Sequence, residues 1–304
     1  MQESILLFFQ RNASPFWDGL FHFFSFMGEP PLYLLILGWL IWNGDKKRSF
    51  AFCFVLMYSV LSNLLLKIIF RHPRPFQSLA EIEGKRLETA GGYSFPSGHT
   101  QNAATFYFSW AAYLGKAFLL PIVFLIVAAI ALSRLYLGVH WPQDVAFGFL
   151  LGVLFPFLLF HRFSRIYEDR RVRFLFLTVT AGASALLGIG FYAASFFLSE
   201  GFDLGDIHKF SMLTSGLACG YLFEYFYGGY STAGTVKTKI LRYAVGLIPI
   251  ALIYTGIKFL LPEWGWLDMI RYFAVGLTAV GLIPWCGVKL KLFQPDDACS
   301  GFKA

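Results

Sequence analysis

The chain alternates long apolar runs with short polar connections along most of its length. A helix needs roughly 20 apolar residues to cross the hydrocarbon core of a bilayer, which is about 30 Å thick. By that measure the pattern predicts about nine spans, of which the first is short and the third begins with polar residues. The predicted spans are residues 30–43, 50–70, 97–115, 117–137, 143–162, 173–199, 207–228, 239–261 and 269–288. The predicted fold class is therefore all-α, a polytopic transmembrane helical bundle.

The residues before the first predicted span differ, because Glu3, Arg11 and Asp18 interrupt their apolar residues. They lack the basic start of a secretory signal peptide. We therefore expect an amphipathic segment at the membrane interface. The predicted organisation is an interfacial segment at 1–29, a catalytic transmembrane core at 30–165, and a C-terminal extension with about four spans at 166–304.

Composition favours the bilayer as the surrounding medium. Of 304 residues, 57% are hydrophobic and 14% are charged, which excludes an ordinary soluble domain. The formal net charge of +7 does not indicate a nucleic-acid partner, because the basic residues form short clusters between apolar runs. The four cysteines lack the spacing of a disulfide framework or a zinc site. The composition predicts the membrane as partner and leaves the oligomeric state open.

Lysine and arginine concentrate in alternate connections, which predicts the side of the membrane for each connection. The basic set contains Lys46, Lys47, Arg48, Lys116, Arg162, Arg165, Arg170, Arg171, Arg173, Lys237, Lys239, Arg242, Lys289, Lys291 and Lys303. Cytoplasmic loops are enriched in these residues, so we expect this set inside. Residues 71–96 then lie outside, and their basic residues need another reason. Compact loops favour a bacterial inner membrane, with the outer face in the periplasm.

The end of the second predicted span carries Lys67, and Arg74 follows it. An ionisable residue within an apolar span is a candidate for a functional site. Pro73 and Pro75 end the helix and turn Arg74 into the loop. Two cations so placed can hold a dianion, and Arg74 is suited to bidentate contact.

The third predicted span begins with Ser97, Gly98 and His99. Ser97 is expected as the helix N-cap, where unpaired amides and the helix dipole favour a phosphate. Gly98 permits close approach of the backbone, and His99 is placed to donate a proton.

Arg134, His140 and Asp144 lie where the fourth predicted span gives way to the fifth. His140 and Asp144 are four positions apart, and Pro142 is tolerated in the first turn of a helix. The carboxylate can therefore reach the imidazole, fix its tautomer and leave the other nitrogen free to attack.

These three segments resemble the signatures of the type 2 phosphatidic acid phosphatase superfamily. The signatures are Lys-x6-Arg-Pro, Pro-Ser-Gly-His and Ser-Arg-x5-His-x3-Asp, and all three match in full. The resemblance, over roughly residues 50–162, implies that His140 attacks phosphorus, oriented by Asp144. It implies that His99 protonates the leaving group and then activates water, with no metal and no cofactor. The implied phosphate-binding residues are Lys67, Arg74, Ser97, Gly98 and Arg134.

The implied function is hydrolysis of a lipid phosphate or diphosphate at the extracytoplasmic face. Polyprenyl diphosphate, phosphatidic acid, phosphatidylglycerol phosphate and sphingoid phosphate all remain open as substrates. The alternatives are a soluble phosphate ester such as a sugar phosphate, a phosphotransferase, and a non-catalytic phospholipid carrier or flippase. A carrier needs neither a nucleophile nor an acid, so His140 and His99 favour the enzyme. We leave His72 out of the site and expect the charged loop at 81–88 to be solvated surface.

Overall fold

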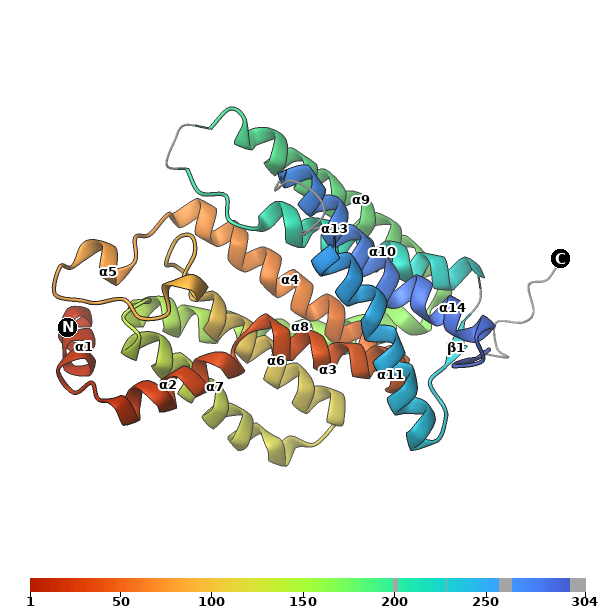
Figure 1. Cartoon of the computed structure of the whole chain (residues 1–304), viewed down its shortest axis with the longest axis horizontal. Helices are drawn as coiled ribbons and strands as arrows, with labels where there is room; N and C mark the ends of the chain where they lie inside the picture. The colour runs from red at the N-terminus through yellow and green to blue at the C-terminus, as the bar shows by residue number, and fades with distance from the viewer. Residues whose placement is uncertain (199–201, 228, 257–263, 296–304) are drawn as a thin grey trace. The chain divides into compact units, whose positions relative to one another are not determined.

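The structure is a computed structural model that describes residues 1–198, 202–227, 229–256 and 264–295. It is built almost entirely of helices, which confirms the all-α class (Figure 1). The helices are α1 Gln2–Arg11, α2 Pro15–Met27, α3 Pro30–Asn43, α4 Lys46–Phe70, α5 Pro75–Ser78, α6 Gly98–Leu114, α7 Leu120–Tyr136, α8 Pro142–Glu168, α9 Arg170–Ser195, α10 Ile207–Tyr227, α11 Val236–Ala251, α13 Gly265–Leu277 and α14 Ile283–Lys289. Strand β1 Tyr230–Ser231 pairs antiparallel with β2 Gln294–Pro295.

Fewer stretches than predicted are long and apolar enough to cross a membrane. Within the described residues there are 6 of them. They are Pro15–Asn43, Lys46–Ser78, Ala117–Tyr136, Pro142–Glu168, Arg170–Ser195 and Gly265–Lys289. The predicted spans 97–115, 207–228 and 239–261 overlap α6, α10 and α11 but are not among the 6, so the prediction of about nine spans is not supported.

Helices α6 and α10 bury small and polar residues. The buried residues of α6 include Thr100, Gln101, Thr105 and Ser109, and those of α10 include Ser211, Thr214, Ser215, Gly216 and Gly220. Small and polar residues are typical of helix contacts within a membrane, whereas lipid-facing surfaces are apolar. The composition of both helices therefore suits contact with neighbouring helices. The span at 239–261 lies partly outside the described residues.

The chain forms two compact units. Unit 1 comprises Met1–Leu34, Ala51–Phe163 and Glu200–Gly205, and unit 2 comprises Leu35–Phe50, Ser164–Ser199 and Asp206–Ala304. The predicted division at 29 and 165 stays a prediction.

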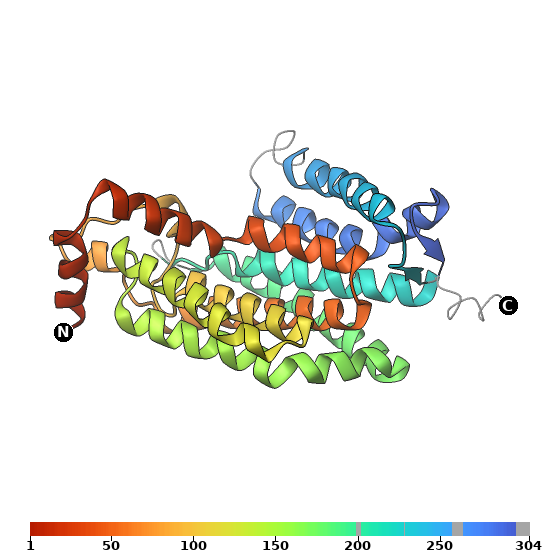
Figure 2. The ribbon, with the colours of Figure 1, turned by 90° about the horizontal axis from the view of Figure 1, so that it is seen from below.

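In unit 1, α7 packs against α6, α2 and α1. Figure 2 shows the red N-terminal helices beside the yellow-green α7. Leu6 of α1 is fully buried in a cluster with Ile82 and Leu135. The candidate span that contains α3 begins at Pro15, with Gly28 and Glu29 between α2 and α3. Helix α1 is thus packed into unit 1, and α2 belongs to an apolar stretch that continues into α3. The interfacial position predicted for residues 1–29 stays a prediction.

In unit 2, α10 packs against α9 and α13, as Figure 1 shows. A Cβ atom on Gly216 would lie 2.1 Å from the Phe273 carbonyl oxygen, and one on Gly276 would lie 2.6 Å from the Leu213 carbonyl oxygen. Only glycine therefore permits α10 and α13 to approach this closely.

Arg242 lies in α11 of unit 2 and is only 1% exposed. Its guanidinium donates to the carbonyls of Leu292, Trp42, Thr232 and Ala233 and to the Asn43 amide oxygen, at 3.0–3.4 Å. It also lies 4.2 Å from the centre of the Phe293 ring. The sequence analysis counted Arg242 among the loop cations. That interpretation is wrong, because the side chain is buried and holds α3, the loop before α11 and the segment after α14 together.

Candidate active site

The three motif segments all belong to unit 1. Helix α4 ends at Phe70 and α5 begins at Pro75, so the chain leaves the helix before Arg74 as predicted. The second segment begins α6, and the third joins α7 to α8, which starts at Pro142.

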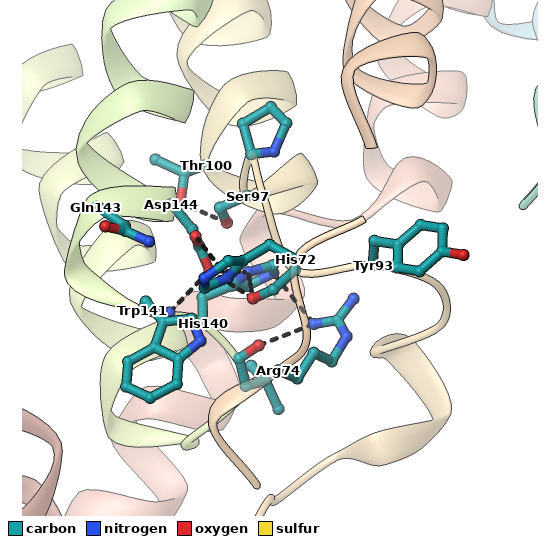
Figure 3. Close-up of polar contacts among 12 residues, drawn as sticks. His72, Arg74, Tyr93, Ser97, Thr100, His140, Trp141, Gln143 and Asp144 are labelled. Carbon is teal, nitrogen blue, oxygen red and sulfur yellow. Dashed lines mark hydrogen bonds and ion pairs between the residues drawn. The ribbon is translucent and has the colours of Figure 1, made fainter. Parts of the chain in front are cut away.

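Two charged side chains flank the His140 imidazole, which is only 1% exposed. His140 Nδ1 lies 3.5 Å from Asp144 Oδ2, and His140 Nε2 lies 3.3 Å from Arg74 Nη1 (Figure 3). A guanidinium can only donate, so Nε2 carries the lone pair and Nδ1 carries the proton. The predicted pairing of His140 with Asp144 is present, and Nε2 is the ring nitrogen that carries no proton.

Electrostatics keep His140 in its neutral form. Burial lowers the pKa of His140 well below its ordinary value, and the positive charges of Arg74, Lys67 and Arg134 lower it further. Burial disfavours a charged imidazole, and nearby cations do the same. A neutral imidazole is the form that a nucleophile needs.

Arg74 is buried, and most of its donors already have partners. Its Nε donates to Gly92 O at 3.0 Å, its Nη2 to Gly91 O at 2.7 Å, and its Nη1 to Val139 O at 2.9 Å. The sequence analysis expected Arg74 to contact phosphate through two bonds, but its Nε and Nη2 both donate to backbone carbonyls in this structure. In this structure Arg74 holds the loop at 91–92 and the segment at 139–140 together around the imidazole.

Lys67 lies close to the start of α6. Its Nζ donates to Tyr93 O and, at 3.3 Å, to Ser94 O. A Cβ atom on Gly98 would lie 3.9 Å from Lys67 Cε and only 3.1 Å from Asn63 Oδ1. Glycine at this position leaves space between the amides of α6 and the lysine.

Ser97 occupies the N-cap position of α6, as predicted. Its hydroxyl does not form a capping hydrogen bond with a backbone amide. Instead, Oγ lies 3.0 Å from Thr100 Oγ1. Its own amide donates to Asp144 O at 3.0 Å. The hydroxyl is thus not hydrogen-bonded to the amides of the first turn of α6.

Arg134 is completely buried in the last turn of α7. Its Nη1 donates to Ser25 Oγ at 2.5 Å, whereas Nε and Nη2 have no hydrogen-bond partner among the described residues. These two groups form the edge that contacts an oxyanion through two parallel bonds. His99 Nε2 is also buried and lacks a partner within the same described part of the chain. Arg134, rather than Arg74, offers the unoccupied bidentate edge.

Sequence reasoning missed several residues around this site. Ser94 Oγ donates to Asp144 Oδ2 and lies 3.3 Å from His140 Nδ1. His72, which we left out, has its Nδ1 4.0 Å from Asp144 Oδ1. Ser94 stands two residues before the Pro-Ser-Gly-His motif, but nothing in the pattern shows that its side chain turns toward Asp144. Ser25, the partner of Arg134, is too distant in sequence for spacing to reveal.

The loop at 81–88 exposes Glu81, Glu83 and Glu88, in keeping with the expected solvated surface, but its two basic residues are anchored. Lys85 forms an ion pair with Asp18, and Arg86 Nη2 lies 2.6 Å from Glu29 Oε1. The backbone amide of Lys85 also donates to Leu137 O at 2.9 Å. These contacts tie the loop to α2, to the α2–α3 junction and to the end of α7.

An apolar groove of about 440 Å³ lies beside His72. It is lined by Phe70, His72, Phe95, Gln143, Ala146, Phe147 and Leu150. Within the described ranges, no group of three or more His, Cys, Asp or Glu side chains is arranged to hold a metal ion.

Two family descriptions match this chain. Residues 48–168 match the PAP2 superfamily, and residues 208–295 match the family described as PAP2 superfamily phosphatase, transmembrane extension. The first range contains every predicted site residue, and the second lies within the predicted C-terminal extension.

The chain is similar to several curated proteins. The lipid A 4'-phosphatase of Bacteroides thetaiotaomicron is 29% identical over 57% of this chain and 83% of that protein. The bacitracin transport permease protein BcrC of Bacillus licheniformis is 31% identical over 47% of this chain and 76% of that protein. The dihydrosphingosine 1-phosphate phosphatase YSR3 of Saccharomyces cerevisiae is 27% identical over 49% of this chain, but the match spans only 39% of the yeast protein.

Proposed function

This chain belongs to the PAP2 superfamily, and we propose that it hydrolyses a lipid phosphate or diphosphate through a phosphohistidine intermediate. The observation that carries the proposal is the buried, neutral His140, with its Nδ1 toward Asp144 and its Nε2 toward the Arg74 guanidinium. The chain is an integral membrane protein with multiple spans, which favours a substrate in the bilayer.

In the first step, the lone pair of His140 Nε2 attacks phosphorus, and the bond from phosphorus to the ester oxygen breaks. Protonated His99 gives a proton to the departing oxygen. The leaving group therefore departs with that oxygen protonated, as an alcohol from a monoester or as a phosphate from a diphosphate. Asp144 stabilises the positive charge of the His140 imidazole while His140 Nε2 is bonded to phosphorus. The three equatorial oxygens carry the developing charge, and fixed donors aimed at them lower the barrier.

The phosphate donors in this proposal come from three elements. Arg134 offers its unoccupied Nε and Nη2 edge, Lys67 an ammonium with donor capacity beyond its two carbonyl partners, and the start of α6 its unpaired amides. Ser97 adds its hydroxyl, and Gly98 leaves room for the anion next to the amides. Arg74 contributes charge and fixes the imidazole.

In the second step, His99 takes a proton from water, and the oxygen attacks phosphorus of the phosphohistidine. The bond from phosphorus to Nε2 breaks, inorganic phosphate leaves, and His140 returns to its neutral form. The chemistry therefore closes with His99 protonated again and no net change in the protein.

A lipid is favoured over a soluble sugar phosphate by the surroundings of the site. Lys67 and Arg134 lie in apolar helices, and the groove beside His72 is lined mainly by apolar side chains. The positive-inside pattern supports an extracytoplasmic site, and compact loops support a bacterial inner membrane. Lipid A phosphatase and sphingoid phosphate phosphatase relatives also have lipid substrates in their names.

A carrier is the second candidate, because one relative is named a transport permease. A carrier has to bind a phosphorylated lipid but does not need the His140 and Asp144 pair. The two functions therefore differ in covalent chemistry, which can be measured directly.

The test uses purified wild type, His140→Ala and His161→Ala in detergent. His161 is exposed on α8 outside the site and serves as the matched histidine control. We expect release of phosphate from at least one of polyprenyl diphosphate, phosphatidic acid, phosphatidylglycerol phosphate and sphingoid phosphate, and an acid-labile phosphoprotein after rapid quenching. Both signals disappear in His140→Ala and persist in His161→Ala. Binding of these lipids without phosphate release in wild type would instead support the carrier.

A further inference from the structure

Buried polar atoms without partners extend beyond the phosphate site, along one face of α6. His99, Asn102 and Phe106 occupy positions three and seven residues apart, which places them on the same side of a helix. Asn102 Oδ1 and His99 Nε2 are both buried and without a hydrogen-bond partner in the described part of the chain. The Tyr33 ring stacks on Phe106 with 4.3 Å between centres, and the Tyr33 hydroxyl is likewise buried and unpartnered there.

The junction between α2 and α3 brings a carboxylate to the same region. A Cβ atom on Gly28 would lie 3.7 Å from His99 Cδ2, so the junction packs directly against the imidazole. Glu29 is the next residue, and its carboxylate forms an ion pair with Arg86. Glu29 directly precedes α3, and Tyr33 lies in the first turn of that helix. We call Glu29, Tyr33 and Asn102 the inner polar cluster.

Unsatisfied buried polar atoms are costly, so in a native protein they usually face water or a ligand. In the proposed reaction, the phosphate oxygens meet the unoccupied edge of Arg134, and the ester oxygen meets His99. The inner polar cluster is left without a role. Its free capacity is mainly that of an acceptor, because an amide oxygen and a carboxylate only accept and a phenol can do both. A group that donates hydrogen bonds would satisfy it.

The geometry of phosphoryl transfer says which part of the substrate reaches this region. The nucleophile and the leaving oxygen lie on opposite sides of phosphorus. With His140 as nucleophile, the leaving alcohol lies on the side of its acid, His99. The first atoms of that alcohol therefore lie closest to the junction that carries Glu29.

We propose that the inner polar cluster of Glu29, Tyr33 and Asn102 recognises a hydrogen-bond donor, a hydroxyl or an ammonium, on the leaving alcohol near the ester oxygen. This inference rests on the proposed phosphatase function and narrows its substrate class. It favours phosphate monoesters of polyol or amino-alcohol lipids over polyprenyl phosphates and phosphatidic acid, whose leaving alcohols carry no donor there.

The test compares kcat/KM for three substrates in wild type, Glu29→Gln and Tyr33→Phe. Phosphatidylglycerol phosphate offers a hydroxyl, sphingoid phosphate a hydroxyl and an ammonium, and phosphatidic acid neither. We expect wild type to prefer at least one donor-bearing substrate over phosphatidic acid, and each variant to reduce that preference about tenfold. A larger effect of Glu29→Gln on the sphingoid substrate identifies the ammonium as the recognised donor, and equal effects on both identify the hydroxyl.

Asp18→Asn is the matched control. Asp18 pairs with Lys85 and accepts from the Tyr136 hydroxyl, so its removal loosens the same loop that Arg86 ties to Glu29. We expect the control to keep the wild-type preference. An unchanged preference in both variants, or an equal loss on all three substrates, would overturn the inference while leaving the phosphatase function standing. A wild type that hydrolyses none of the three and also fails on polyprenyl diphosphate contradicts the proposed function itself.

Discussion

Each of the two units buries an arginine, and the two side chains are satisfied in opposite ways. Arg134 in unit 1 and Arg242 in unit 2 are 0% and 1% exposed. Arg242 donates to five oxygens, all of them uncharged. Arg134 donates only to Ser25, and its Nε and Nη2 find no partner in the part of the chain that the structure describes.

The difference separates a structural cation from a binding cation. A buried charge is expensive unless it is paired or hydrogen-bonded. Arg242 meets that requirement with carbonyls of its own unit, so it stabilises the fold and needs nothing else. Arg134 does not meet it, and an incoming phosphate supplies the missing oxygens. A buried arginine in a membrane helix therefore indicates a binding function when some of its N–H donors lack a partner, and a structural function when all of them are paired.

The largest effect expected from this comparison is on activity. Arg134→Met removes two donors aimed at the transition-state oxygens, and we expect kcat/KM to fall about 10³-fold or more. The melting temperature should stay the same or rise, because an incompletely satisfied buried charge is removed. Phosphate release and thermal unfolding in detergent measure the two effects. A lower melting temperature with little loss of activity would reverse the roles of the two arginines.

The second effect is on stability. Arg242→Met leaves several buried carbonyls without donors, and we expect a loss of about 3 kcal/mol or more in the free energy of unfolding. The protein that remains folded should keep its kcat/KM, because the five hydrogen-bond partners of Arg242 all belong to unit 2. Unfolding of wild type and variant under the same detergent conditions gives the comparison. An unchanged stability would show that its five bonds contribute nothing.

The smallest effect concerns Ser25, whose hydroxyl accepts a hydrogen bond from Arg134 Nη1. Ser25→Ala removes the oxygen that fixes Nη1, so the unoccupied edge is held less firmly. We expect kcat/KM to fall about tenfold, consistent with one hydrogen bond to a charged group, with little change in melting temperature. Ser25→Thr keeps the hydroxyl and should restore most of the activity. Equal activity in wild type and Ser25→Ala would remove Ser25 from the account.

Much of the site follows from sequence spacing because its determinants are local. His140 and Asp144 are one helical turn apart, and Pro142 starts α8 between them, so their contact can be deduced without a structure. The helix breaks around Arg74 and at Ser97 follow from proline and capping preferences in the same way. The sequence does not show which N–H groups of each cation lack a partner. That depends on the position of backbone carbonyls, such as those of Gly91 and Gly92, which accept from Arg74.

The rest of the fold depends on contacts that spacing cannot reveal. Counting Arg242 as a loop cation was wrong because its partners Trp42 and Leu292 are far away in sequence. The number of predicted spans also depends on where each helix ends, which an apolar run does not show. Helix α6 has 17 residues and α11 has 16, fewer than the roughly 20 that a span needs.

The most direct test of the central claim is an experimental structure of the protein with orthovanadate, an analogue of the phosphoryl group in transfer. The account predicts vanadium bonded to His140 Nε2, with two vanadate oxygens about 2.7–2.9 Å from Nε and Nη2 of Arg134. Arg242 should keep the partners it has now. Vanadate held elsewhere, or bound at His140 while the Arg134 edge contacts only protein groups, would contradict the account.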